Sequence, residues 1–96
     1  MIYTSPLEIL ENTYALRILV VLKRKGPLFR SILYNLISKS TGAPRIRVDE
    51  LIEAGLLEEK ISTVPPFTKT VSLTEKGKKV AEKVAEIEEI LREEER

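Results

Sequence analysis

Arg45, Ile46 and Arg47 place two guanidinium groups on either side of an isoleucine. On a helical wheel centred on the apolar residues, Ile46 points outward and the two arginines lie on the shoulders. A guanidinium group can bind guanine through two hydrogen bonds or clasp a phosphate, and isoleucine can touch a thymine methyl group. Alternatively, both arginines form surface ion pairs with Glu50, Glu53 or other nearby carboxylates.

Other polar residues around this run could contact phosphate groups. Ser40 and Thr41, with the backbone N–H groups at the start of a helix, form a natural phosphate seat. Simple N-capping explains Thr41 equally well. Arg30 and Ser31, on the preceding predicted helix, could contact the DNA backbone, whereas partial burial in the core explains Tyr34 at least as well.

The segment TVPPFTKTVSLTEKG predicts an exposed hairpin followed by a helix start. Proline cannot donate a hydrogen bond to a sheet, so Pro65 and Pro66 must lie in the turn or on an edge. We expect the strands over about residues 57–61 and 68–73, with the tip at about 62–67.

Lysine and threonine side chains on this hairpin could meet phosphate or the minor groove. They are Lys60, Thr63, Thr68 and Lys69. Lysines on an exposed hairpin serve equally often to prevent edge-to-edge pairing of strands. The hairpin therefore supports contact with nucleic acid without requiring it.

The composition excludes several classes of chemistry. The 96 residues include no cysteine and no histidine, which removes disulfides, thiolate catalysis, zinc clusters and the usual general base. Without a Gly-rich phosphate loop or an inward-facing pair of carboxylates, we expect no enzymatic activity, no metal and no cofactor. No stretch is apolar enough to span a membrane and no signal peptide is evident, so we expect a cytoplasmic protein without a membrane partner.

The net charge of +1 is unevenly distributed. Residues 1–48 hold eight Lys or Arg against two Glu, which gives +6, and residues 49–96 hold eight against thirteen Asp or Glu, which gives −5. A basic first half suggests a polyanion partner, and ordinary solvated surface is the competing interpretation. In the predicted helix of about residues 41–54, the N-terminal half is neutral to basic and the C-terminal half is acidic. This polarity suits a helix whose N-terminus enters the major groove of DNA and whose acidic end stays away from the phosphates.

Two helices are predicted before the first glycine. Ser5, Pro6 and Glu8 indicate a helix start with a capping box. The run over residues 13–25 is apolar nearly all round and ends at Gly26, so this helix needs cover on two sides.

Two more helices should follow, separated by a short turn. The first, over about residues 28–38, has an expected inner face of Phe29, Leu33, Leu36 and Ile37. The second, over about 41–54, has an expected inner face of Pro44, Val48, Leu51 and Ile52. Gly55 should end it in the left-handed conformation.

A last helix should extend over about residues 74–95, with Thr74 as its N-cap. A stripe at coiled-coil spacing runs along it: Gly77, Val80, Val84, Ile87 and Leu91. We expect Val80, Val84, Ile87 and Leu91, together with Leu16 and Leu19, to form a homodimer interface. Packing on the chain's own first long helix is the alternative.

Four segments carry a resemblance to a known family: SPLEILENTYALRIL, KGPLFRSILYNL, RVDELIEAGLLEE and TVPPFTKTVSLTEKG. They resemble, in that order, four features of the HxlR-type transcription regulators. These are the Cys-Pro-x-Glu start, the Gly-Pro followed by the second helix, the end of the recognition helix, and the Pro-Pro wing. The HxlR-type regulators form a branch of the MarR-like winged-helix proteins. Ser5 stands where many members have cysteine, so thiol-based sensing is not carried over. The turn before the recognition helix is about one residue shorter, and Pro44 is unusual so near the reading surface.

The resemblance implies a mainly α-helical fold with a small β-hairpin: a winged helix-turn-helix with an N-terminal helix and a long C-terminal dimerisation helix. It covers nearly the whole chain, as a single domain of residues 1–96. Helices one and two would occupy about 5–38, the recognition helix 41–54, the wing 57–73 and the dimerisation helix 74–95. We also expect an archaeal source.

The implied function is that of a dimeric, DNA-binding transcription regulator. The helix of residues 41–54 would lie in the major groove of double-stranded DNA, and the wing would lie on the backbone or in the minor groove. A winged-helix protein–protein interaction module and a non-specific chromatin protein are the alternatives. An unknown small-molecule effector could bind between the dimerisation helices and the DNA-binding lobe.

Overall fold

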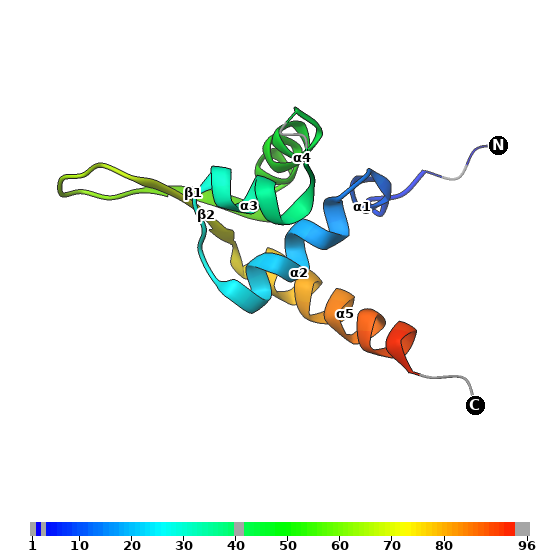
Figure 1. Cartoon of the computed structure of the whole chain (residues 1–96). Coiled ribbons are helices and arrows are strands. Elements are labelled where there is room, and N and C mark those ends of the chain that lie inside the picture. The colour runs from blue at the N-terminus through cyan, green and yellow to red at the C-terminus, as the bar shows by residue number, and fades with distance from the viewer. Residues whose placement is uncertain (1, 3, 40–41, 94–96) are drawn as a thin grey trace.

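The computed structural model describes residues 2, 4–39 and 42–93. Its elements are α1 (Glu8–Glu11), α2 (Ala15–Lys25), α3 (Arg30–Ile37), α4 (Gly42–Glu53), β1 (Leu57–Ile61), β2 (Lys69–Leu73) and α5 (Glu75–Arg92) (Figure 1). The helices form the body, and the two strands make a hairpin that projects from it. The predicted fold class, mainly α-helical with a small β-hairpin, is confirmed. Ser40 and Thr41, the predicted phosphate seat, lie outside the described residues.

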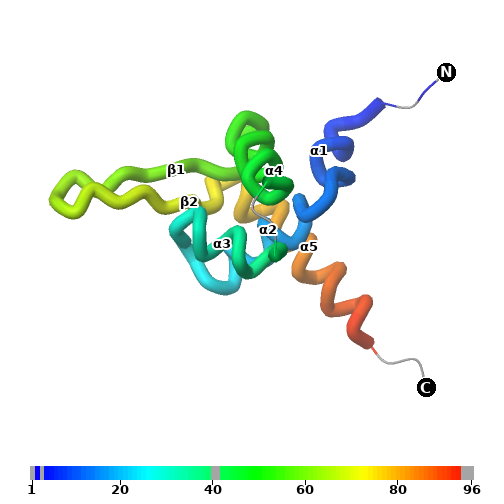
Figure 2. Tube along the Cα trace, turned by 45° about the horizontal axis from the view of Figure 1, so that its top comes forward, coloured from blue at the N-terminus to red at the C-terminus, as the bar shows by residue number. Residues whose placement is uncertain are grey.

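The core forms around α2, which buries one apolar side and exposes a side that carries Arg17 and the basic residues of its last turn. Ala15, Ile18 and Leu19 have no exposed surface, and Leu22 is 2% exposed. α5 covers one side of α2 and diverges from the hairpin (Figure 2), while α1, α3, α4 and β2 also contact α2. Burying one such side chain contributes about 1.5–3 kcal/mol, and α2 buries several of them. The other elements are therefore positioned by their packing against α2.

The inner face of α3 differs from the predicted one. Phe29 and Leu36 are 43% and 47% exposed, whereas Leu33, Tyr34 and Ile37 are buried. Phe29 precedes the helix in an extended conformation, so it does not follow the helical periodicity. Tyr34 takes an inner position because its hydroxyl has a polar partner within the same helix.

The hairpin is antiparallel, and Ile61 pairs with Lys69 at its outer end. At its base, the Leu28 N–H donates to the Val71 carbonyl at 3.1 Å, and the Val71 N–H donates to the Leu28 carbonyl at 2.8 Å. Leu57 and Val71 are buried, whereas the outer half is largely exposed. The base of the hairpin therefore belongs to the core, and its tip lies in solvent.

Gly55 and Thr74 join α4 and α5 across the base of the hairpin. Gly55 has a φ of 82°, the left-handed conformation expected at the end of a helix. The Thr74 hydroxyl accepts a hydrogen bond from the Gly77 N–H at 3.0 Å and donates one to the Gly55 carbonyl at 2.6 Å. The predicted C-cap and N-cap are both confirmed, and one side chain connects them.

Ser5 and Glu8 make only one of the two hydrogen bonds of the predicted capping box, and Leu7, not Ser5, is the N-cap of α1, which is a single turn. The Glu8 carboxylate accepts from the Ser5 N–H at 3.3 Å, and the Ser5 hydroxyl accepts from the Leu7 N–H at 3.1 Å. These contacts hold the start of the chain in a helical turn before α2 begins.

Candidate nucleic-acid interface

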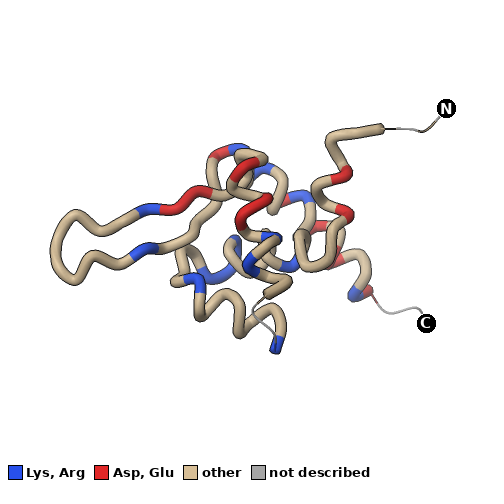
Figure 3. Tube along the Cα trace, turned by 90° about the horizontal axis from the view of Figure 1, so that it is seen from above, with Lys and Arg blue, Asp and Glu red and all other residues tan. Residues whose placement is uncertain are grey.

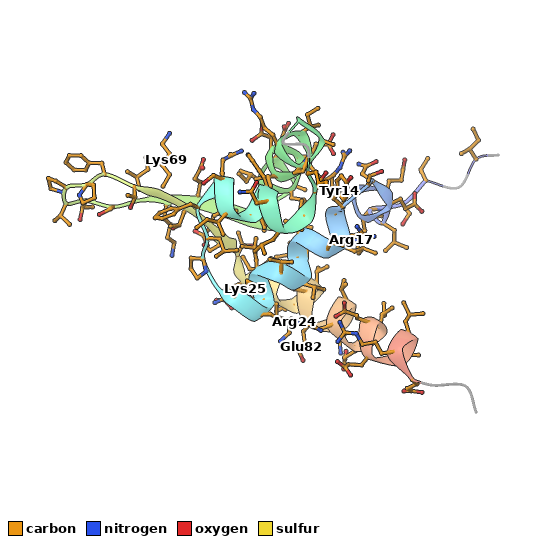
Figure 4. All side chains as sticks on the ribbon, in the orientation of Figure 1. Tyr14, Arg17, Arg24, Lys25, Lys69 and Glu82 are labelled. Carbon is orange, nitrogen blue, oxygen red and sulfur yellow. The ribbon has the colours of Figure 1, made fainter. Side chains whose placement is uncertain are left out.

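α4 and the hairpin border an open depression of about 490 Å³, and we call this side of the molecule the α4–hairpin face. Its lining comes from α3, α4 and both strands: Arg30, Tyr34, Arg45, Asp49, Glu59 and Lys69. In Figure 4, Lys69 projects from the hairpin toward the side on which α4 lies. Three cations from three separate elements thus line one depression.

Packing determines which side of α4 reaches this face. Pro44, Val48 and Leu51 are buried against the core, as the helical wheel predicts. Arg45 and Ile46 are exposed, Ile46 by 56%. Pro44 lies in the first turn of α4, where a missing N–H breaks no helical hydrogen bond.

Arg45 and Lys69 have no carboxylate within ion-pair distance among residues 2, 4–39 and 42–93. Both side chains are exposed. They are therefore the cations of the α4–hairpin face that form no ion pair within the described residues, although Lys69 lies close enough to Glu59 to lower the pKa of that carboxyl group.

Arg47 differs from Arg45 because its guanidinium group has partners within the chain, and its contact with DNA stays a prediction. Its side chain is only 15% exposed. Its Nε donates to the Thr13 carbonyl at 2.8 Å, and its Nη1 pairs with Glu50, which also accepts from Asn12. The alternative of an ion pair with Glu50 thus applies to Arg47, and the arginine holds α4 to the segment before α2.

Arg30 also has partners within the chain. Its Nε donates to Glu59 Oε2 at 2.8 Å and its Nη2 to Glu59 Oε1 at 3.4 Å. Its Nη1 lies 2.9 Å from Asp49 Oδ1 and donates to the Tyr34 hydroxyl at 2.9 Å. Arg30 thus belongs to an internal network that spans α3, α4 and β1, and its predicted contact with the DNA backbone stays a prediction.

This network shifts the proton affinity of both partners. The hydrogen bonds from Arg30 hold the pKa of Glu59 below its ordinary value, against the opposing effect of partial burial. The same carboxylate raises the pKa of Arg30, with smaller contributions from Tyr34 and Asp49. Both groups therefore stay charged near neutral pH.

The remaining predicted contacts lie on different sides of the hairpin and helices. Ser31 and Thr63 are exposed, on α3 and at the tip of the hairpin. Lys60 is exposed but borders a separate depression with Glu58 and Ser72, because alternate residues of a strand face opposite sides. Figure 3 shows the two hairpin lysines as one blue segment on each strand, with an uncharged tip between them. Lys60 and Lys69 therefore do not form one patch.

A second surface, on α2 and α5, is apolar. Leu16, Ile87 and Leu91 are 43%, 54% and 78% exposed, and Val80 is partly buried. Leu16, Val84 and Ile87 border two open depressions of about 570 and 670 Å³ beside α2 and α5, and Leu91 borders the first; Val80 borders neither and packs against the core. Leu19 is corrected: it has no exposed surface and lies in the core, because the inner side of α2 turns it away from this surface.

Charged side chains surround this apolar surface. Arg24 of α2 pairs with Glu88 of α5, and Arg17 lies over the Tyr14 ring with its Cζ 5.9 Å from the ring centroid. Arg17, Arg24 and Lys25 all come from α2 (Figure 4). The α2–α5 surface is thus an apolar strip with a polar border.

The described part of the chain contains no group of three or more His, Cys, Asp or Glu residues that could hold a metal ion. None of its helices is long and apolar enough to cross a membrane. The α4–hairpin face and the α2–α5 surface are thus the two candidate surfaces.

The network around Arg30 shows what the sequence reasoning missed. From the sequence, no role in binding is assigned to Asp49 or Glu59, and Tyr34 is expected to be partly buried, without Arg30 being named as its partner. One local signal was present, because Arg30 and Tyr34 are four residues apart on one helix and such residues are neighbours. No comparable signal connects Arg30 to Glu59, which lies 29 residues away.

Comparisons with known proteins reveal relatives only through structure. No protein-family model matches the chain, and no curated protein matches its sequence. A MarR family transcriptional regulator from Silicibacter pomeroyi DSS is 30% identical with a TM-score of 0.72, over 82% of this chain and 53% of that protein. The chain thus spans about half the length of that regulator.

Two further structures match more of their own length. A possible HxlR family transcriptional factor from Thermoplasma volcanium GSS1 is 24% identical with a TM-score of 0.79, over 92% of this chain and 79% of that one. The transcriptional regulator YodB from B. subtilis, in its reduced form, is 22% identical with a TM-score of 0.75, over 90% and 89% of the two chains.

The element order and these structures define a winged helix-turn-helix protein. α3 and α4 are the helix-turn-helix pair, and the β1–β2 hairpin is the wing. The chain is similar in fold to MarR-family and HxlR-family structures, and the winged helix-turn-helix fold that the resemblance in the sequence implies is confirmed.

Proposed function

We propose that this chain is a DNA-binding transcription regulator that acts as a homodimer. The N-terminal half of α4 enters the major groove, and the hairpin contacts the backbone or the minor groove. The structural relatives, which are described as transcriptional regulators, support this class of function.

The pattern of paired and unpaired charges on α4 carries the proposal. Asp49 and Glu50 would repel phosphate, but each is paired with an arginine from within the chain. Arg45 precedes them on the same helix and has no such partner in the described residues. The unpaired cation lies in the half of α4 that would enter the groove first.

Lys69 extends this cationic surface to the hairpin. It lines the same depression as Arg45, and its ammonium group has no ion-pair partner among the residues that the structure describes. Exposed Ile46 lies next to Arg45 on α4. The arrangement suits a guanidinium group and a methyl-contacting side chain in the major groove, with an ammonium group on a flanking phosphate.

The homodimer would form through the α2–α5 surface. An exposed apolar strip of this kind is typical of a surface that is covered by a partner. The α4–hairpin face lies at the other end of the molecule from α5 (Figure 1). A second copy bound to α5 would therefore leave the α4–hairpin face of each subunit free for DNA. Leu16, Val80, Val84, Ile87 and Leu91 are the proposed contact residues.

Selection of bound duplexes from a random library tests the proposal. We expect a palindromic product with half-sites about one helical turn apart, or a multiple of that distance. Fluorescence anisotropy on the selected duplex should show affinity that falls steeply as salt increases, because phosphate contacts release counterions. Absent or salt-independent binding to all duplexes would contradict DNA binding, and equal binding to all sequences would contradict a specific regulator.

A further inference from the structure

Arg30, Tyr34, Asp49 and Glu59 form a polar cluster that joins α3, α4 and β1, and we call it the Arg30 clamp. We propose that the clamp fixes the hairpin relative to α4, so that Arg30 is a positioning residue for the DNA-binding surface. The effect on DNA rests on the proposed function, whereas the effect on the hairpin does not.

Most of the guanidinium group is used inside the clamp. Two N–H groups bind Glu59 at 2.8 and 3.4 Å, and Nη1 contacts Tyr34 and Asp49 at 2.9 Å each. Three of the five N–H donors of the arginine are therefore hydrogen-bonded within the chain, and Nη1 also forms an ion pair with Asp49. A fork of this kind is directional, so it sets the relative orientation of the groups that it joins.

The charge of the clamp argues against a direct phosphate contact by Arg30. The side chain is 28% exposed, and its single positive charge faces two carboxylates, which leaves the cluster with a net charge of −1. A phosphate that approached Arg30 would therefore compete with two carboxylates already paired with it, whereas Arg45 and Lys69, which line the same depression, form no ion pair within the described residues.

The partners of Arg30 lie on the two elements that must act together on DNA. Asp49 is four residues after Arg45 on α4, so the two share one side of the helix. Glu59 lies on β1, beside the strand that begins with Lys69. Because Arg30 holds Asp49 and Glu59 at the same time, it sets the distance between the side chains of Arg45 and Lys69. This distance must match the distance between a base edge in the major groove and a neighbouring phosphate.

A distance measurement without DNA tests the clamp directly. The chain has no cysteine, so Thr63→Cys at the hairpin tip and Glu53→Cys at the end of α4 can be spin-labelled without side reactions. Mixing with excess unlabelled protein restricts pulsed EPR to distances within one subunit. We expect a narrow distribution in the parent and a broadened or shifted one in Arg30→Lys and Glu59→Gln.

Glu58→Gln is the matched control. It removes the same charge from the adjacent residue of β1, whose side chain borders the opposite face of the hairpin. We expect its distance distribution to equal that of the parent. Thermal unfolding of every variant shows whether the clamp only stabilises the fold. In that case the unfolding temperature of Arg30→Lys and Glu59→Gln would fall, while the distances in the folded protein would equal those of the parent.

DNA binding then separates positioning from contact. We expect Arg30→Lys and Glu59→Gln each to weaken binding to the selected duplex by roughly 2- to 30-fold, with a double variant no weaker than the worse single one. If Arg30 instead touched phosphate, lysine would keep most of the affinity, and Glu59→Gln would strengthen binding by freeing the guanidinium group.

Each outcome decides one part of the proposal. Unchanged distances in both variants overturn the clamp. Changed distances with parent-like DNA affinity overturn its role in recognition. If the parent binds no duplex, the proposed function fails, while the distance measurement still decides whether Arg30 holds the hairpin to α4.

Discussion

Gly77 of α5 lies directly against the backbone of Leu56, the residue before β1. A Cβ built on Gly77 would lie 1.9 Å from the Leu56 carbonyl oxygen and 2.9 Å from its carbonyl carbon. The same carbonyl oxygen accepts a hydrogen bond from the Thr74 N–H at 3.1 Å. The first turn of α5 therefore packs on the base of the hairpin through a position that only glycine fits.

Gly77→Ala should destabilise the protein even though alanine is the better helix former. Alanine in a helix is favoured over glycine by about 1 kcal/mol. The clash with rigid backbone acts in the opposite direction, and overpacking of this kind typically costs about 1–3 kcal/mol. We expect a net decrease in the free energy of unfolding, measured by urea denaturation. Lys78→Ala, on the exposed side of the same turn, should change it by less than about 0.5 kcal/mol, and a more stable Gly77→Ala variant would contradict the packing.

The fold was predictable where the signals are local. Gly55 and Thr74 mark helix ends through their own backbone conformation or side-chain hydrogen bonds, which depend on neighbours within a few residues. The adjacent prolines mark the hairpin for the same reason. The apolar run of residues 18–22 likewise predicts the buried side of the central helix, because only burial explains it.

The candidate interface was less predictable because its decisive contacts are long-range. A helical wheel for α4 places Arg45 and Arg47 symmetrically, yet the structure pairs Arg47 with the Thr13 carbonyl, 34 residues away, and leaves Arg45 exposed. The partners of an arginine depend on which elements pack beside its helix, and the sequence of that helix does not contain this information.

Acid should remove the stabilisation that Glu59 provides. Arg30 lowers the pKa of Glu59 in the folded protein, with Lys69 acting in the same direction and Asp49 against it. On acidification the unfolded chain therefore binds this proton first, so stability falls as the pH falls through the lowered pKa. We expect the difference in unfolding free energy between the parent and Glu59→Gln to be greatest near neutral pH and to shrink below the ordinary pKa near 4.5.

Urea unfolding of both proteins at a series of pH values from neutral to acidic measures this difference. Glu58→Gln is the control, since no comparable contact is formed by that side chain within the described residues. A difference for Glu59→Gln that stays constant across the series would show that its charge does not contribute to the folded state.

Arg45→Ala and Arg47→Ala should separate DNA contact from structural support. Removing a phosphate or base contact at Arg45 should weaken binding, and a lost phosphate contact lowers the slope of log affinity against log salt by about 1. Arg47→Ala should instead lower the free energy of unfolding by about 1.5–3 kcal/mol, because charged hydrogen bonds to Thr13 and Glu50 are lost. Anisotropy titrations and urea denaturation of both variants give the two readouts. The reverse pattern, a stability effect at Arg45 and a slope effect at Arg47, would exchange their roles.

Ile87→Glu should dissociate the proposed dimer. Ile87 and Ile46 are 54% and 56% exposed, so the same substitution at both positions places equal charge on equally exposed side chains of α5 and α4. Burying an unpaired carboxylate in an interface costs about 3 kcal/mol or more, which raises the dissociation constant by roughly 100-fold or more. Sedimentation velocity should show the parent and Ile46→Glu at twice the subunit mass of 10.9 kDa, and Ile87→Glu at the subunit mass. Dissociation by Ile46→Glu, with an intact Ile87→Glu dimer, would place the interface on the α4–hairpin face and remove that face from DNA binding.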